Sequence, residues 1–187
     1  MSTLFVDSIQ PKTTGQAITV ATTNQSLGKV LQIKQGILRT NYAMPSNNQQ
    51  WNDMPLSVTI TPSSSSSQIH IQAMISYSLS DGAHGSFKIV RNNTDFLLTT
   101  EALGLRYAAH LHHHMASAYD TDYQIQNGVI NVLDSPATTS ELVYKLQALL
   151  AHNSGYRAYL NHLGLRSENA NYQAYCVSTI TATEIGG

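Results

Sequence analysis

Charged side chains are scarce in this chain of 187 residues. Asp, Glu, Lys and Arg make up 11% of the sequence, whereas an ordinary soluble domain contains about 25%. The formal net charge is -1, and the sequence lacks the clustered Lys and Arg residues that bind phosphate backbones. We therefore expect no nucleic-acid partner.

The chain also has a single cysteine and no long hydrophobic run. Cys176 alone cannot form an intrachain disulfide or a thiolate zinc site. No apolar stretch reaches the roughly 18 residues of a membrane span, and residues 1–10 lack the basic and apolar parts of a secretory signal. We expect neither membrane insertion nor secretion through a signal peptide.

Uncharged polar residues take the place of the missing charges. Ser, Thr, Asn and Gln together account for 64 of the 187 residues, beside 42% hydrophobic residues. This apolar fraction is large enough for a core and excludes wholesale disorder. The length fits one domain, or one domain with an extended arm, since a domain takes roughly 100 to 200 residues.

Hydrophobic residues recur mostly at every second position, which is typical of an all-β protein. In residues 68–77 the alternation places one apolar set on one side of a strand: Ile69, Ile71, Ala73, Ile75 and Tyr77. Further strands are predicted at residues 28–39, 56–61, 85–90, 96–99, 128–133, 156–160 and 172–185. The expected fold is a β-sandwich or jelly-roll-like head.

Residues 139–152 fit two patterns. Ser140 followed by an amphipathic spacing of leucines suits an N-capped helix. The alternation also suits a strand, because every second residue from Leu142 to Leu150 is apolar and a Ser-Pro turn and Gly155 bracket the run. We favour the strand.

Residues 1–27 differ from the rest of the chain. They hold two short β-prone pieces, 4–6 and 17–20, which cannot bury themselves alone. We predict an N-terminal arm over residues 1–27 that packs on other chains, and a globular head over residues 28–187. The predicted attachment residues of the arm are Leu4, Phe5, Val6 and Ile9.

A histidine cluster is the strongest candidate for a metal site. On a strand, His110, His112 and His114 would project to one side, which suits imidazole coordination of a transition metal, particularly if symmetry brings three copies together. The alternative is a polar strand face whose imidazoles form hydrogen bonds. We keep the three histidines as metal candidates and predict no cofactor.

Motifs of catalysis are missing from the sequence. It contains no nucleophile elbow and no phosphate-binding loop, and Cys176 lies in an apolar segment that suits a buried thiol. Asp120 and Asp122 resemble the start of a calcium loop, but the Gly and Glu that complete such a loop are absent. We predict that the protein is not an enzyme.

Tyrosine dominates the aromatic residues, with ten Tyr against three Phe and one Trp. A tyrosine ring has an apolar body and a polar tip, which suits subunit interfaces and sugar-binding surfaces. We favour core and interface positions for most of them and keep glycan contact as the alternative.

Several segments together resemble fibre and appendage proteins of marine bacteriophages, including cyanophages. The similarity covers nearly the whole chain, and the order of the segments is its most specific feature. The segments are MSTLFVDSIQP at residues 1–11, GKVLQ at 28–32, LSVTITPSS at 56–64, FKIVRN at 87–92, VLDSP at 132–136, TTSELVY at 138–144, YLN at 159–161 and STITATEI at 178–185.

The resemblance implies a virion structural protein made in the host cytoplasm, a homotrimer with an N-terminal attachment arm and a β head. Its partners would be other virion proteins, and the head would contact a host surface glycan or receptor. The alternative is a capsid decoration protein that stabilises the shell. The family pattern has no histidine-rich stretch, so the segment around residues 110–114 departs from it.

Overall fold

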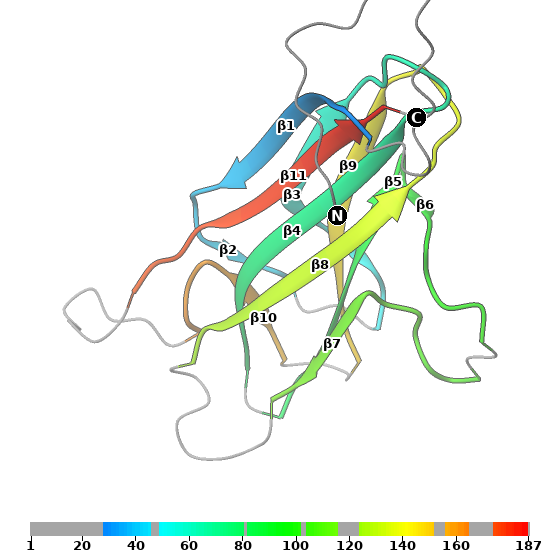
Figure 1. Ribbon diagram of the computed structural model, residues 1–187. Coiled ribbons are helices and arrows are strands. Elements are labelled where there is room, and N and C mark those ends of the chain that lie inside the picture. Colours follow the sequence, from blue (N-terminus) through cyan, green and yellow to red (C-terminus); the bar gives the residue numbers. More distant parts are fainter. Residues whose placement is uncertain are drawn as a thin grey trace, which may run out of the picture.

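The computed structural model describes residues 28–45, 49–80, 82–101, 104–115, 124–151, 156–164 and 174–186, and in these the regular secondary structure is β-strand (Figure 1). The all-β prediction is confirmed. The strands are β1 Val30–Leu38, β2 Tyr42–Ala43, β3 Asn52–Ile60, β4 Gln68–Leu79, β5 His84–Arg91, β6 Thr94–Asp95, β7 Leu111–His114, β8 Gln126–Asp134, β9 Leu142–Leu150, β10 Ala158–Leu160 and β11 Ser178–Ile185.

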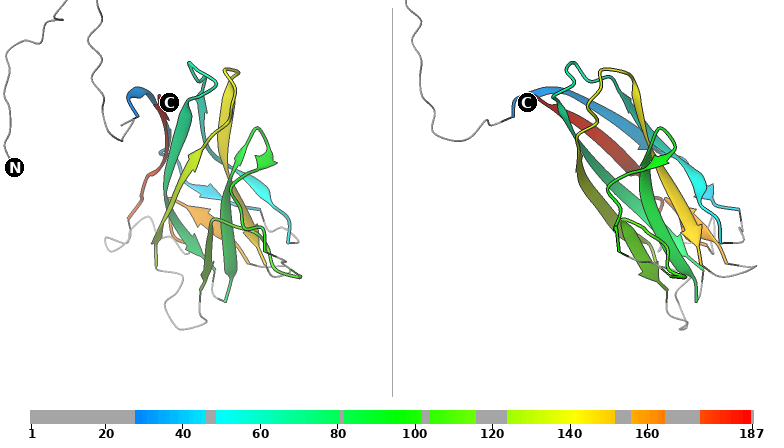
Figure 2. Two further views of the ribbon diagram at one scale, coloured as in Figure 1. Left: turned by 45° about the vertical axis from the view of Figure 1, so that its right-hand side comes forward. Right: turned by 90° about the vertical axis from the view of Figure 1, so that its right-hand side faces the viewer.

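The strands form two antiparallel sheets. Sheet A runs in the order β1-β11-β4-β10-β2, with β8 on the other side of β4. Sheet B runs in the order β3-β9-β5-β6, and β7 also pairs with β5. The two sheets lie face to face as two layers in the turned views (Figure 2). This strand order does not establish jelly-roll connectivity, which stays a prediction.

The core lies between the two sheets and comes from alternate residues of the long strands. The predicted inner residues of β4, from Ile69 to Tyr77, are at most 2% exposed. Strand β9 contributes a second alternating set, with Tyr144 and Leu146 fully buried. The strand prediction for residues 139–152 is therefore confirmed by β9, whose residues alternate between buried and half-buried from Leu142 to Ala148, an alternation that a helix would not maintain.

Strand β1 closes one side of the molecule by approaching β3. A Cβ atom at Gly36 would lie 1.9 Å from the carbonyl oxygen of Ser57, so no residue with a side chain fits at this crossing. The edge strand of sheet A therefore meets the edge strand of sheet B backbone to backbone.

Several predicted strand limits were wrong. Residues 96–99 form no strand, and the hairpin partner of β5 is the two-residue β6. Leu97 has a φ of 51°, a left-handed conformation that interrupts extended backbone. Strand β11 begins at Ser178 rather than at 172, and β10 begins at Ala158 rather than at 156. The predicted arm, residues 1–27, lies outside the described residues.

A buried carboxylate joins the two sheets. Asp134 on β8 of sheet A accepts two hydrogen bonds of 2.8 Å from Nη1 of Arg91 on β5 and one of 2.7 Å from the hydroxyl of Tyr144 on β9. Burial and the neighbouring Asp134 carboxylate raise the pKa of Tyr144, so the phenol stays protonated and donates. Removing one partner would leave a buried polar group unpaired, so these bonds fix how the sheets meet.

Glu184 is the second buried carboxylate, on β11. Its oxygens accept hydrogen bonds from Nε2 of Gln32 at 2.6 Å and from the backbone and hydroxyl groups of Ser63, both at 2.7 Å. Burial raises the pKa of Glu184, but these hydrogen bonds outweigh it and bring the pKa down to about 2. The ionised carboxylate thus ties the loop after β3 to sheet A.

The substitution Glu184→Gln tests this contact. Ionised Glu184 stabilises the fold above the pKa of about 4.5 that it has in the unfolded chain, and this contribution is lost as pH falls toward its folded pKa of about 2. We expect E184Q to lower the free energy of unfolding by about 2 kcal/mol at neutral pH. Chemical denaturation at several pH values measures this difference, which should shrink below pH 4.5. A constant difference down to pH 2 would contradict the assignment.

Candidate functional site

Strand β7 carries part of the predicted histidine cluster. It pairs with β5 so that His114 lies opposite His84 and His112 lies opposite Ser86. The rings of His84 and His114 stack with their centroids 3.9 Å apart, and Nδ1 of His112 lies 2.9 Å from the hydroxyl of Ser86. His113 points the other way, toward the hydroxyl of Tyr77 at 2.9 Å. The alternation expected for a strand therefore holds for His112 and His114.

His110 precedes β7 and is fixed by backbone contacts. Its Nδ1 atom accepts a hydrogen bond of 3.1 Å from the amide of Ile89, which requires an unprotonated Nδ1. Burial lowers the pKa of His110, the nearby Asp95 carboxylate raises it and Lys88 lowers it again, with a net lowering. His110 therefore holds the β5 backbone as a neutral imidazole.

The described residues of one chain do not bring the predicted histidines together as a metal site. Among the described residues, no group of three or more His, Cys, Asp or Glu side chains is arranged to hold a metal ion. An axial site built from three copies stays a prediction. Asp120 and Asp122 lie outside the described residues, as do the predicted attachment residues Leu4, Phe5, Val6 and Ile9. Cys176 is a half-buried free thiol that precedes β11.

The outer surface of sheet A is a more extensive candidate. Three rows of paired residues cross β1, β11, β4 and β8, and we call their twelve side chains the sheet A outer face. The rows are Ile33, Thr183, His70 and Leu133; Gln35, Thr181, Gln72 and Asn131; and Ile37, Thr179, Met74 and Val129.

The sheet A outer face is both apolar and uncharged. Its five apolar side chains are between 45% and 61% exposed. The other side chains are Thr, Gln, Asn and one His, so the surface contains no Asp, Glu, Lys or Arg. Met74 and Val129 are direct neighbours, and Ile37 lies in the same row. Exposed apolar side chains grouped in this way are typical of interaction sites on soluble proteins. Since these side chains add nothing to the core between the sheets, the surface suits contact with another protein.

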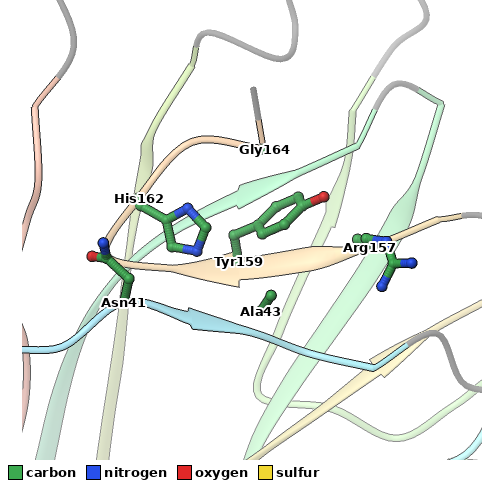
Figure 3. A pocket seen from close by; sticks show the side chains of 6 residues that line it. All are labelled: Asn41, Ala43, Arg157, Tyr159, His162 and Gly164. Carbon is green, nitrogen blue, oxygen red and sulfur yellow. The ribbon is translucent and has the colours of Figure 1, made fainter. Parts of the chain in front are cut away.

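A pocket of about 390 Å³ lies at one margin of sheet A, beside β2 and β10 (Figure 3). We call it the Tyr159 pocket. The ring of Tyr159 lies in its centre, Asn41 and His162 lie at one end and Arg157 at the other. The rings of His162 and Tyr159 pack edge to face with their centroids 5.0 Å apart. Nδ1 of His162 lies 2.6 Å from the carbonyl oxygen of Leu163. The lining residues are Asn41, Ala43, Arg157, Tyr159, His162 and Gly164.

Sequence reasoning found neither surface as a site. The alternation in residues 68–77 identified one side of β4 as mostly polar, but apart from Met74 the apolar residues of the sheet A outer face come from two other predicted strands whose pairing was unknown. The Tyr159 pocket joins residues 41–43 to 157–164, and its only sequence signal was the excess of tyrosine. The alternation within a strand shows which residues share a face, but it does not show which strands lie next to each other. Both surfaces could therefore be recognised only from the folded structure.

Comparison with known proteins does not assign the chain to a family. Neither the known family models nor the curated proteins include a match. The resemblance to phage fibre proteins therefore stays a prediction. In the part of the chain that the structure describes, no helix is long and apolar enough to cross a membrane.

The burial of His110 predicts a pH effect on stability. A histidine with a lowered pKa stabilises the fold while it is neutral, so this contribution declines as pH falls below about 6.5. His110→Asn keeps an acceptor near Nδ1 but removes the titration. We expect the unfolding free energy of H110N to fall less between pH 7 and pH 5 than that of the wild type. Urea denaturation followed by Trp51 fluorescence measures the unfolding free energy at each pH. Equal declines in the wild type and H110N would contradict the assignment.

Proposed function

We propose that this chain is a structural protein of a phage virion, a tail-fibre or appendage component without enzymatic activity. It assembles as a homotrimer, attaches to other virion proteins through residues 1–27 and contacts a host surface glycan with its head. The phage setting and the trimer come from the resemblance of the sequence segments. Self-assembly has independent support in the sheet A outer face.

The sheet A outer face is the observation that carries the proposal. Its exposed apolar side chains gain free energy when a partner covers them. Its Thr, Gln and Asn side chains both donate and accept hydrogen bonds, so they can pair with the same residue types on another copy. Without formal charges the surface does not repel itself, and a repeated copy of one face is what a symmetric assembly requires.

The arrangement of the ends also supports a protein that is attached at one end. The backbone amide of Gly186 donates to the carbonyl oxygen of Lys29, so the first described strand begins next to the end of β11. This point is beside Gln68, which pairs with Ile185, whereas Ser78 at the far end of β4 pairs with Tyr159. Ten strand residues separate the two, about 33 Å. The Tyr159 pocket therefore lies far from Lys29, near which the described part of the head begins.

The second candidate function is a capsid decoration protein that stabilises the shell. The same outer face would then cover a capsid surface instead of another copy of this chain. The two functions differ in where the protein lies on the particle. Gold-labelled antibody on isolated particles would mark tails or appendages for the first function and the shell for the second.

Deletion of residues 1–27 tests the attachment arm. We expect the truncated chain to fold, because the described core comes from residues 28–186, and to be absent from particles. Host cells expressing tagged full-length or truncated protein during infection provide the particles, and gradient-purified particles are probed for the tag. Cooperative thermal unfolding of the truncated chain controls for folding. Equal amounts of both forms in particles would show that the arm is not the attachment segment.

A further inference from the structure

We propose that the Tyr159 pocket binds one carboxylated sugar residue of a glycan, such as a uronic or sialic acid. The inference rests on the proposed glycan contact and adds the site and the class of sugar.

The ring of Tyr159 is kept open by two small neighbours. Ala43 lies directly opposite Tyr159 in the pairing of β2 with β10, and its side chain is a single methyl group. On the other side, a Cβ atom at Gly164 would lie 2.8 Å from Cε2 of the Tyr159 ring. Larger residues at 43 or 164 would cover or displace the ring. The Tyr159 ring is half-buried and lines the pocket, and an aromatic ring on a strand is suited to stacking against the apolar side of a sugar ring.

Three polar groups around this ring have no partner in the described part of the chain. The Asn41 amide, the Tyr159 hydroxyl and the Arg157 guanidinium form no side-chain hydrogen bond or ion pair there. All three belong to the same pocket and extend along it from one end to the other (Figure 3). They offer donors at both ends of a bound sugar ring and an acceptor at Asn41.

The charge of the pocket selects an acidic ligand. Arg157 is a permanent cation, and the described residues that line the pocket include no carboxylate. Arg91, in contrast, already pairs with the carboxylate of Asp134. A guanidinium binds a carboxylate with two parallel hydrogen bonds, so a carboxylated sugar gains an interaction that a neutral sugar lacks. The polar lining also disfavours a purely apolar ligand.

Titration of the full-length protein with defined oligosaccharides tests the proposal. The probes are oligomers of glucuronic acid, oligomers of galacturonic acid and sialyllactose, each compared with its neutral counterpart: glucose oligomers, galactose oligomers and lactose. Calorimetry and saturation-transfer NMR measure affinity. We expect at least one acidic probe to bind about tenfold more tightly than its neutral counterpart. This is the difference in affinity expected when the neutral sugar lacks one charge-assisted hydrogen-bonding interaction.

Three variants locate the binding. Arg157→Gln should remove the preference for the acidic probe, and Tyr159→Ala should weaken binding of both acidic and neutral probes by about tenfold or more. Gly164→Ala should weaken binding without removing any polar group, because the new methyl displaces the ring. Tyr107→Ala and Lys34→Gln, exposed residues outside the pocket, are the matched controls and should bind as the wild type does.

Each other outcome overturns the inference. Equal affinity for acidic and neutral probes would exclude the carboxylate preference, and wild-type affinity in Y159A would place binding elsewhere. Absence of binding to every probe would exclude the site. None of these results bears on attachment through residues 1–27, because incorporation into particles is measured separately from sugar binding. Likewise, if residues 1–27 proved not to attach the protein to particles, the sugar titration would still test the pocket.

Discussion

Burial of alternate residues between two sheets is the constraint on which the rest of this structure depends. Strands β4 and β9 each place one continuous apolar row in the core. A slip of one residue in β4 would bury Gln72 and expose Ile71 and Ala73, so the register is strongly fixed. The carboxylate of Asp134 also fixes how the two sheets meet, because its hydrogen-bond partners Arg91 and Tyr144 lie on the opposite sheet. With the inner faces fixed, the outer faces are left for interactions with other molecules.

The few ion pairs of the described structure are unevenly distributed between the two sheets. The ion pairs among the described residues join β5 to β6, β5 to β8 and β9 to β3, so all three involve sheet B. The sheet A outer face has no charged side chain and more than one exposed isoleucine. A surface made only for solubility would place Lys and Glu at such positions. The combination of exposed apolar side chains with Thr, Gln and Asn therefore suits a surface that another chain covers.

The sequence predicted the class of fold and most long strands because alternation is a local signal. It identified the inner residues of β4 and resolved the helix or strand ambiguity at β9 correctly. It failed at residues 96–99, where the left-handed backbone at Leu97 ends the extended chain, a feature that a run of β-prone residues does not reveal. The outer face and the Tyr159 pocket depend on which strands are neighbours. For β10 and β2 the partners are more than 100 residues apart in sequence.

The solution mass of the full-length chain tests the central claim, self-assembly through the sheet A outer face. Light scattering on a sizing column should give three times the chain mass of 20.4 kDa. Met74→Lys, which places a cation amid the outer face, should shift the mass toward one chain. Thr59→Lys, an exposed strand position on sheet B, should keep the wild-type mass. A wild-type monomer, or an assembly that M74K leaves intact, would contradict the account.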